Sequence, residues 1–228
     1  MVKNVFIDLD DTILNFLAAE KAALSRTLAH FGIEPDERVL SRYSAINDAQ
    51  WKLLEKGEIT RDEVKIRRYA LLFEEFGIDC DPLAVNDHYM EELSKGHIFM
   101  EGAKELLDAL FGKYRLYLAS NGTAWVQERR LKSADLYRYF DGVFISQDLG
   151  FNKPDPRFFE GAFATIEDFK KEETVMVGDS LTSDIKGGKG AGLKTLWFNP
   201  KGIENTTGIL PDHTFTRLAE LPALLKTL

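Results

Sequence analysis

Short apolar runs without polar alternation constrain the fold of this chain more than any other feature of its sequence. Five runs are rich in β-branched and aromatic residues: Asn4–Asp8, Arg115–Ala119, Gly142–Ile145, Thr174–Gly178 and Lys194–Phe198. A strand covered on one face alternates between apolar and polar residues, whereas a parallel strand covered on both faces stays apolar. Helical patterns separate the last four runs, and a sixth short strand is expected around residues 213–215. The sequence therefore predicts an α/β protein with a doubly wound, mostly parallel sheet.

The segment between the first two runs differs from the rest of the chain. Residues 16–95 contain no convincing strand but several helical patterns. Thr60–Glu63 has the pattern of a capping box, which marks a helix start. The apolar residues expected on one face of that helix are Ile66, Tyr69, Phe73 and Phe76. We therefore expect a helical domain at residues 16–95, inserted into an α/β core formed by residues 1–15 and 96–228.

Composition and charge exclude several classes of protein. The 228 residues carry a formal net charge of -8, from 37 acidic and 29 basic residues, so a nucleic acid polymer or an anionic membrane is not an expected partner. Cys80 is the only cysteine, which excludes an internal disulfide and a thiolate zinc site. No apolar stretch approaches the roughly 20 residues of a membrane span, and no signal peptide is recognisable. We expect a cytoplasmic monomer or homodimer.

Polar side chains follow the predicted strands at their carboxyl ends, where an open parallel sheet binds its ligands. These residues are Asp8, Asp10, Ser120, Asn121, Gly122, Lys153, Asp179 and Asp184. The set supplies two groups of carboxylates, a hydroxyl with adjacent backbone amides, and a lysine. Because this chain is acidic overall, an anionic substrate would need such local positive charge, from the lysine, a metal ion or a helix N-terminus.

Carboxylates that are forced together repel one another unless a cation offsets their charge. Mg²⁺ prefers oxygen ligands and is commonly held by one or two carboxylates and a substrate phosphate, so Asp8 and Asp179 are natural ligands. An oxygen of Asp8 could then attack phosphorus as a nucleophile. Asp10, two residues further on, could protonate the leaving oxygen and later deprotonate the hydrolytic water.

The remaining residues suit a phosphate group. Lys153, Ser120 and the amides of Asn121 and Gly122 could hold the phosphoryl oxygens, with the N-terminus of a helix from Thr123 pointing at the anion. Ordinary structural explanations also exist. The aspartates could be loop carboxylates or could favour the first turn of a helix, as Asp184 would, and the lysine could be a solvated surface residue.

The same residues resemble the four motifs of the haloacid dehalogenase superfamily. Asp8-x-Asp10 resembles motif I, Ser120 motif II, Lys153 motif III, and Gly178-Asp179 with Asp184 motif IV. One such motif recurs by chance, but four in order, each at a predicted strand end, form a specific signal. The resemblance implies a Rossmann-like core and a helical cap that closes over the substrate. It also implies Mg²⁺ bound by Asp8 and Asp179 and by the backbone carbonyl of Asp10, with Asp184 supporting the site.

Asp10 separates two branches of this superfamily, because its dehalogenases lack a second acid at this spacing. Four segments resemble the pyrimidine 5'-nucleotidase subgroup: residues 120–122, 144–146, 178–188 and 197–200. The leading hypothesis is hydrolysis of nucleoside 5'-monophosphates, with Trp51 of the helical domain as a candidate contact to the base. The alternatives are a phosphatase of small metabolites such as phosphoglycolate or sugar phosphates, a phosphomutase, and a non-catalytic binding or regulatory member.

Overall fold

The computed structural model describes all 228 residues, which form two compact units. One unit contains Met1–Asn15 and Phe99–Leu228, and the other contains Phe16–Ile98. The junctions predicted from the sequence follow residues 15 and 95. The two chain segments at the junction are neighbours within the first unit, because the Met100 N–H donates to the Ile13 carbonyl at 2.9 Å. The second unit is therefore inserted between two adjacent segments of the first.

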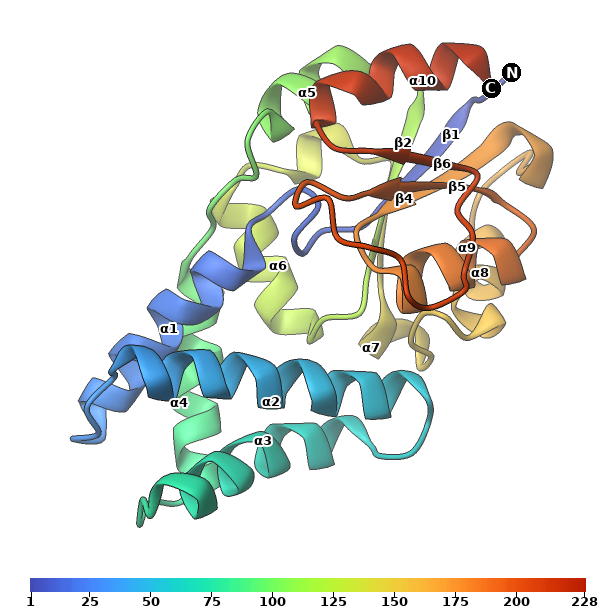
Figure 1. Ribbon diagram of the computed structural model, residues 1–228. Helices are drawn as coiled ribbons and strands as arrows, with labels where there is room; N and C mark the ends of the chain where they lie inside the picture. The colour runs from blue at the N-terminus through green and yellow to red at the C-terminus, as the bar shows by residue number, and fades with distance from the viewer. The chain divides into compact units, whose positions relative to one another are not determined.

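The first unit is built on a six-stranded parallel sheet with the strand order β3-β2-β1-β4-β5-β6 (Figure 1). The strands are β1 (Asn4–Ile7), β2 (Arg115–Ser120), β3 (Gly142–Ile145), β4 (Thr174–Gly178), β5 (Lys194–Phe198) and β6 (His213–Phe215). The predicted fold class is confirmed. Because β1 lies between β2 and β4, the residues that follow these three strands share one edge of the sheet.

Helices cover both faces of this sheet. The α-helices are α5 (Ala103–Leu110), α6 (Ala124–Ser133), α7 (Ser146–Leu149), α8 (Pro156–Phe163), α9 (Lys186–Gly190) and α10 (Leu221–Thr227). The short helical turns are η1 (Tyr137–Tyr139), η2 (Lys171–Glu173), η3 (Leu181–Ile185) and η4 (Leu218–Glu220). Residues of α5, α6 and α10 share one apolar core with the sheet, and residues of α8 share the other. Figure 1 shows α5 and α10 along one side of the sheet and α8 and α9 along the other.

The central strand shows why the predicted strands lack polar alternation. Val5 and Ile7 are fully buried in the core under α5 and α10, whereas Phe6 is fully buried in the core on the α8 side. Phe6 stacks on Tyr117 of β2, with ring centroids 5.1 Å apart. Since successive side chains of a strand point to opposite faces, a strand with helices on both sides needs apolar residues at every position.

The second unit contains only helices, as the sequence predicted for this segment. They are α1 (Phe16–His30), α2 (Glu37–Glu55), α3 (Arg61–Phe76) and α4 (Pro82–Lys95). Helix α1 packs against α4 and α2, and α3 packs against α2 and α4. The predicted capping box is confirmed, since the Glu63 N–H donates to Thr60 Oγ1 at 3.2 Å and the Thr60 N–H donates to Glu63 Oε2 at 2.7 Å.

The buried face of α3 matches the prediction only in part, since Tyr69 and Phe73 are buried but Ile66 is not. Ile66 is 44% exposed, whereas Tyr69 is buried as expected. Arg68 lies on the buried face instead, and its guanidinium donates to the side-chain oxygens of Asn47 at 3.0 Å and Asn86 at 2.7 Å. The prediction for Ile66 is wrong because a pattern of apolar residues cannot anticipate a buried arginine whose partners are polar residues of α2 and α4.

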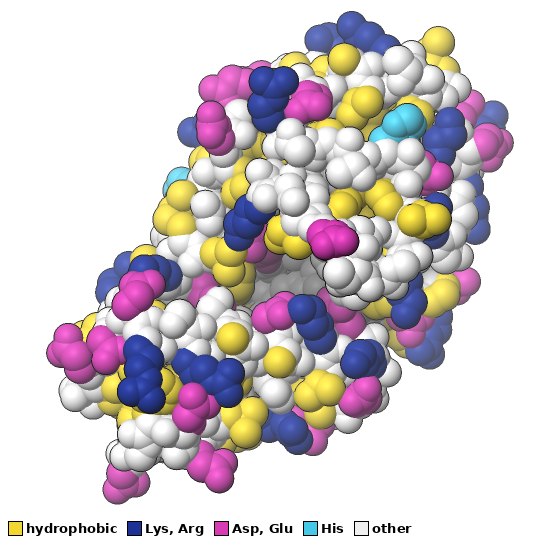
Figure 2. Space-filling view, viewed as in Figure 1, with side chains coloured by type: hydrophobic (Ala, Val, Ile, Leu, Met, Phe, Trp, Pro, Cys, Tyr) yellow, Lys and Arg dark blue, Asp and Glu magenta, His cyan; other side chains and the backbone are white.

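The surface gives little indication of a polyanionic partner. Figure 2 shows basic and acidic side chains interspersed over the visible face, with hydrophobic residues scattered among them. The acidic residues outnumber the basic ones, 37 to 29, so the summed charge does not attract nucleic acid. No helix combines the length and the apolar character that crossing a membrane requires.

Candidate active site

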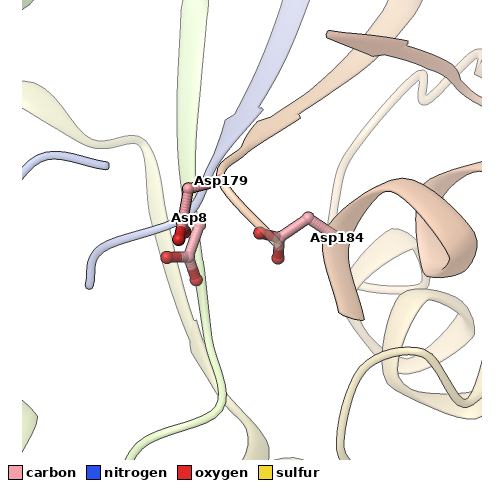
Figure 3. A group of neighbouring side chains, drawn as sticks. All are labelled: Asp8, Asp179 and Asp184. Atoms are coloured by element: carbon pink, nitrogen blue, oxygen red, sulfur yellow. The ribbon is translucent and has the colours of Figure 1, made fainter. Parts of the chain in front are cut away.

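Three carboxylates meet at the carboxyl edge of the sheet. Asp8 follows β1 directly, and its N–H donates to the carbonyl of Val177 in β4 at 2.9 Å. Asp179 follows β4 directly, and Asp184 lies in η3. Figure 3 shows the carboxyl groups of Asp8, Asp179 and Asp184 gathered beyond the ends of these strands. One carboxylate oxygen of each residue lies within 4.8 Å of the others. The parallel pairing of β1 with β4 thus brings together aspartates that are far apart in the sequence.

Asp184 reaches this cluster through space that a glycine leaves open. A Cβ atom on Gly178 would lie 2.1 Å from Asp184 Oδ2, which is closer than any real contact. The same oxygen accepts a hydrogen bond from the Ser180 N–H at 3.0 Å. Asp184 is only 1% exposed. The glycine of the Gly178-Asp179 pair therefore has a packing function that the spacing of the aspartates does not reveal.

Lys153 is buried at the centre of the cluster. Its Nζ donates to Asp8 Oδ1 at 2.6 Å, to Asp184 Oδ1 at 2.7 Å and to the Ala119 carbonyl at 2.5 Å, which uses all three of its protons. The Asn121 side chain holds the lysine's backbone, since Asn121 Oδ1 accepts from the Lys153 N–H and Asn121 Nδ2 donates to the Lys153 carbonyl, both at 2.8 Å. Lys153 is therefore held both at its backbone and at its ammonium group.

The electrostatics of the cluster show an excess of negative charge. The pKa of Asp8 is raised to about 8: burial raises it most, Lys153 lowers it, and the carboxylates of Asp184 and Asp10 raise it again. The pKa of Asp179 is also raised well above its usual range, by burial and then by Asp184 and Asp8. Burial would lower the pKa of Lys153, but Asp184 and Asp8 outweigh it and the pKa is raised. One lysine does not balance three neighbouring carboxylates.

The donor set fits a hard divalent cation. All three candidate ligands offer carboxylate oxygens, which Mg²⁺ prefers, and the surplus of negative charge is what such an ion would offset. Both oxygens of Asp184 already accept hydrogen bonds, from Lys153 and from the Ser180 N–H. Asp8 and Asp179 are therefore the better candidates for direct ligands, and Asp184 is better placed to hold the lysine.

Ser120 ends β2 beside this cluster and is 1% exposed. Its Oγ accepts from the Gly122 N–H at 3.2 Å and from Gln127 Nε2 at 2.9 Å. Helix α6 begins just after, with Thr123 as its N-cap residue. Of the predicted phosphate-binding residues, Ser120 and Gly122 thus lie at the start of α6, while the Asn121 side chain is occupied by Lys153.

Sequence reasoning missed the residues that surround Asp10. Asp10 Oδ1 accepts from Arg130 Nη1 at 2.6 Å, and Asp10 Oδ2 accepts from Gln127 Nε2 at 2.6 Å. Both donors lie on the inner face of α6, and Arg130 is fully buried. The sequence contains little indication of this contact, because a glutamine and an arginine three residues apart on a helix are usually surface residues.

Two residues beside Asp179 were missed as well. Thr12, in the turn after β1, is fully buried, and its hydroxyl donates to Asp179 Oδ1 at 3.3 Å. The indole N–H of Trp197, in β5, donates to the Asp179 carbonyl at 2.7 Å. These contacts hold the side chain of Asp179 from the turn after β1 and its backbone from β5.

Both the sequence and the structure of this chain match known proteins. The sequence profile of the haloacid dehalogenase-like hydrolase family matches residues 5–198. The chain is 37% identical to a Bacillus subtilis protein named as a HAD-hydrolase, YfnB, over 98% of this chain and 95% of that protein. A crystal structure of YfnB bound to magnesium covers 98% of each chain with a TM-score of 0.94.

Two further relatives carry names that state an activity. The pyrimidine 5'-nucleotidase PynA of Streptococcus pneumoniae is 40% identical over 92% of this chain and 90% of its own length. The pyrimidine 5'-nucleotidase YjjG of Escherichia coli is 29% identical over 97% of this chain and 96% of its own length. The family profile and these relatives span almost the whole chain, including the inserted helices. The chain belongs to the haloacid dehalogenase-like hydrolase family.

Proposed function

We propose that this protein is a magnesium-dependent phosphomonoester hydrolase that forms a phosphoaspartate on Asp8. The observation that carries the proposal is the buried contact between Asp8 and Lys153, at 2.6 Å, within reach of the carboxylates of Asp179 and Asp184. A nucleophilic carboxylate, a fixed cation and a candidate divalent metal site are together the requirements of phosphoryl transfer to an enzyme group. Asp10, two residues after Asp8, supplies the acid/base group.

In the first half of the proposed reaction, a carboxylate oxygen of Asp8 attacks phosphorus and the bond from phosphorus to the leaving oxygen breaks. Asp10 transfers a proton to that leaving oxygen, which departs as an alcohol. Lys153, Ser120 and the backbone N–H groups at the start of α6 hold the phosphoryl oxygens. All three protons of Lys153 already have acceptors, so a contact with a phosphoryl oxygen requires the ammonium group to exchange one of those acceptors for the phosphate.

In the second half, water attacks the phosphoaspartate and Asp10 accepts a proton from it. Inorganic phosphate leaves, and Asp8 returns to its free carboxylate. Asp8 and Asp179 would hold Mg²⁺, with the Asp10 carbonyl as a further ligand and Asp184 supporting the site. When bound, Mg²⁺ would offset the charge of these carboxylates and of the phosphate, and so permit one anion to approach another.

For the substrate class, we propose nucleoside 5'-monophosphates, with pyrimidine nucleotides preferred. The support is the names of two relatives that span most of this chain, the pyrimidine 5'-nucleotidases PynA and YjjG, at 40% and 29% identity. The strand-end residues bind a phosphate and do not select the leaving group, so they support the reaction class and leave the substrate to the relatives.

The test is phosphate release from a panel of phosphomonoesters, with the purified protein and Mg²⁺. The panel contains pyrimidine and purine 5'-monophosphates, phosphoglycolate, sugar phosphates and an aryl phosphate. We expect turnover with Mg²⁺, loss of turnover with a chelator and recovery when Mg²⁺ is added back, with the highest kcat/KM for a pyrimidine nucleotide.

Each part of the proposal can fail separately. A strong preference for sugar phosphates or phosphoglycolate would replace the nucleotidase activity with that of a small-metabolite phosphatase. Turnover that resists the chelator would remove the metal from the mechanism. No turnover of any phosphomonoester with any divalent metal would leave a non-catalytic binding protein.

A further inference from the structure

The carboxylate of Asp10 is held on both of its oxygens by one helix. Oδ1 accepts from Arg130 Nη1 and Oδ2 accepts from Gln127 Nε2, each at 2.6 Å. Arg130 Nη1 also donates to Gln127 Oε1 at 2.8 Å, so the three side chains form a closed ring of hydrogen bonds. Contacts to both oxygens fix the plane of a carboxylate, whereas a contact to one oxygen leaves it free to rotate.

Arg130 is an unusual residue for the inner face of α6, because burying a charged guanidinium is unfavourable. Its side chain is fully buried, whereas that of its partner Asp10 is 27% exposed. Removing a guanidinium from water is unfavourable, and a partly solvated carboxylate offsets only part of that penalty, so an ion pair of this kind is weak evidence for a stabilising function. The fold alone therefore does not explain why an arginine occupies this position.

Gln127 connects Asp10 to the predicted phosphate-binding loop. Its Nε2 donates to Ser120 Oγ at 2.9 Å as well as to Asp10. The side chain reaches both only because residue 122 is glycine, since a Cβ atom there would lie 2.3 Å from Gln127 Cγ and Nε2. The glycine of the Ser120-Asn121-Gly122 motif thus makes room for a side chain that joins the phosphate-binding hydroxyl to the acid/base carboxylate.

We propose that Arg130 and Gln127 are positioning residues, which orient the carboxyl group of Asp10, so that its protonated form gives a proton to the leaving oxygen and its ionised form later takes one from water. This inference rests on the proposed phosphatase function. Proton transfer requires the donor oxygen to lie within about 2.6–3.2 Å of its acceptor in a suitable direction. A misplacement of about 1 Å costs as much as two orders of magnitude in rate, so a group that fixes the orientation contributes to catalysis without touching the substrate.

The experiment compares two leaving groups in the intact enzyme with Mg²⁺. The variants are Arg130→Met and Gln127→Leu, which keep side-chain bulk and remove the donors, and Lys132→Met is the matched control, an exposed cation on the same helix. The substrates are a nucleoside 5'-monophosphate, with a poor alkoxide leaving group, and p-nitrophenyl phosphate, whose leaving group needs little protonation. The measured quantity is kcat/KM for each substrate.

We expect Arg130→Met and Gln127→Leu to lower kcat/KM for the nucleotide by about 10- to 100-fold, because a misplaced Asp10 loses only part of the roughly 10²- to 10⁴-fold that general acid catalysis contributes. The loss with p-nitrophenyl phosphate should be at least about fivefold smaller, since that leaving group departs without a proton. The control should stay within about twofold of the parent enzyme for both substrates. Equal losses for the two substrates would mean that Arg130 and Gln127 act on structure or phosphate binding, and would overturn the proposal.

A double-mutant cycle gives a second, independent readout. In an Asp10→Asn background, adding Arg130→Met should cause no further loss, because the group that Arg130 orients can no longer transfer a proton. An additive loss would contradict the proposal. If Arg130→Met does not fold, Arg130→Lys, which keeps the charge and loses the planar fork, takes its place in both experiments. Failure of the parent enzyme to hydrolyse any phosphomonoester would instead refute the proposed function, so the two failures are distinguishable.

Discussion

At the scale of single residues, the site depends on close approaches that glycines permit. Gly178 leaves the space that the Asp184 carboxylate occupies, and Gly122 leaves the space that Gln127 occupies. Neither glycine has a positive φ, so neither is required for its backbone conformation. Their function is the absence of a side chain where a polar group must pass.

The first residue-scale prediction concerns the nucleophile. Asp8→Asn should lower kcat by at least about three orders of magnitude, because an amide oxygen cannot form the phosphoaspartate. Steady-state phosphate release and trapping of the phosphorylated protein measure this. Far-ultraviolet circular dichroism should show an unchanged fold. Asp8→Asn with parental turnover would exclude covalent catalysis through this residue.

The second residue-scale prediction concerns Gly178. Gly178→Ala places a methyl group 2.1 Å from Asp184 Oδ2, so the carboxylate must move and Lys153 loses a partner. We expect kcat to fall by about 10- to 100-fold, as for other small displacements in an active site. Gly190→Ala is the matched control, since nothing lies within 4 Å of a Cβ atom there. Equal activity of the two variants would mean that the position of Asp184 does not matter.

At the scale of helices and strands, local signals and tertiary contacts determine different features. The start of α3 follows from Thr60 and Glu63, which form a capping box within one turn of the chain. The buried face of α3 follows from Arg68, whose guanidinium lies 4.9 Å from the ring centre of Tyr89 in α4 and also contacts polar residues of α2 and α4. The start of a helix can therefore be predicted from a local pattern. Its buried face cannot always be predicted, because that face depends on the elements that pack against it.

The capping box gives a stability prediction. Thr60→Ala should lower the free energy of unfolding by about 1 kcal/mol, because the N–H of the third helical residue loses its side-chain acceptor. Urea denaturation measures the change. Ser41→Ala, at an exposed position within α2, is the control and should change stability by less than about 0.5 kcal/mol. A Thr60→Ala protein as stable as its parent would show that α3 needs no cap in this fold.

At the scale of the whole molecule, ionisation of the buried aspartates is unfavourable, and a bound cation would offset their negative charge. The pKa of Asp8 is raised to about 8 and that of Asp179 is raised as well, chiefly by burial. The folded protein therefore binds more protons here than the unfolded chain between the ordinary aspartate pKa, 3.8, and about 8. The sign follows directly: without metal, this site lowers the stability of the folded protein progressively as the pH rises through that window.

We predict a stability difference that depends on pH and on Mg²⁺. Without metal, Asp8→Asn should be more stable than the parent protein, and its advantage should grow between about pH 5 and pH 8. Excess Mg²⁺ should stabilise the parent protein more at the higher pH, because the ion binds the ionised carboxylates and releases their protons. Urea denaturation at the two pH values, with and without Mg²⁺, measures both effects. A constant difference between the two proteins would contradict the raised pKa of Asp8.

The sequence alone determined the class of fold, the place of every strand along the chain and the residues at the strand ends, whereas the order of the strands in the sheet came from the structure. It could do so because β-branched apolar runs and capping residues act over a few neighbouring positions. It also indicated the family, since four motifs recur in one order. The roles of the individual site residues remain predictions.

Only the tertiary structure decided which side chains surround those residues. Arg130 and Gln127 meet Asp10 because α6 packs beside the end of β1, and 120 positions of sequence separate Arg130 from Asp10. Lys153 is buried among aspartates from β1 and η3, which no local pattern records. The physical reason is that a hydrogen bond depends on distance and direction in space, and distant parts of a chain acquire both only when the sheet and its helices pack together.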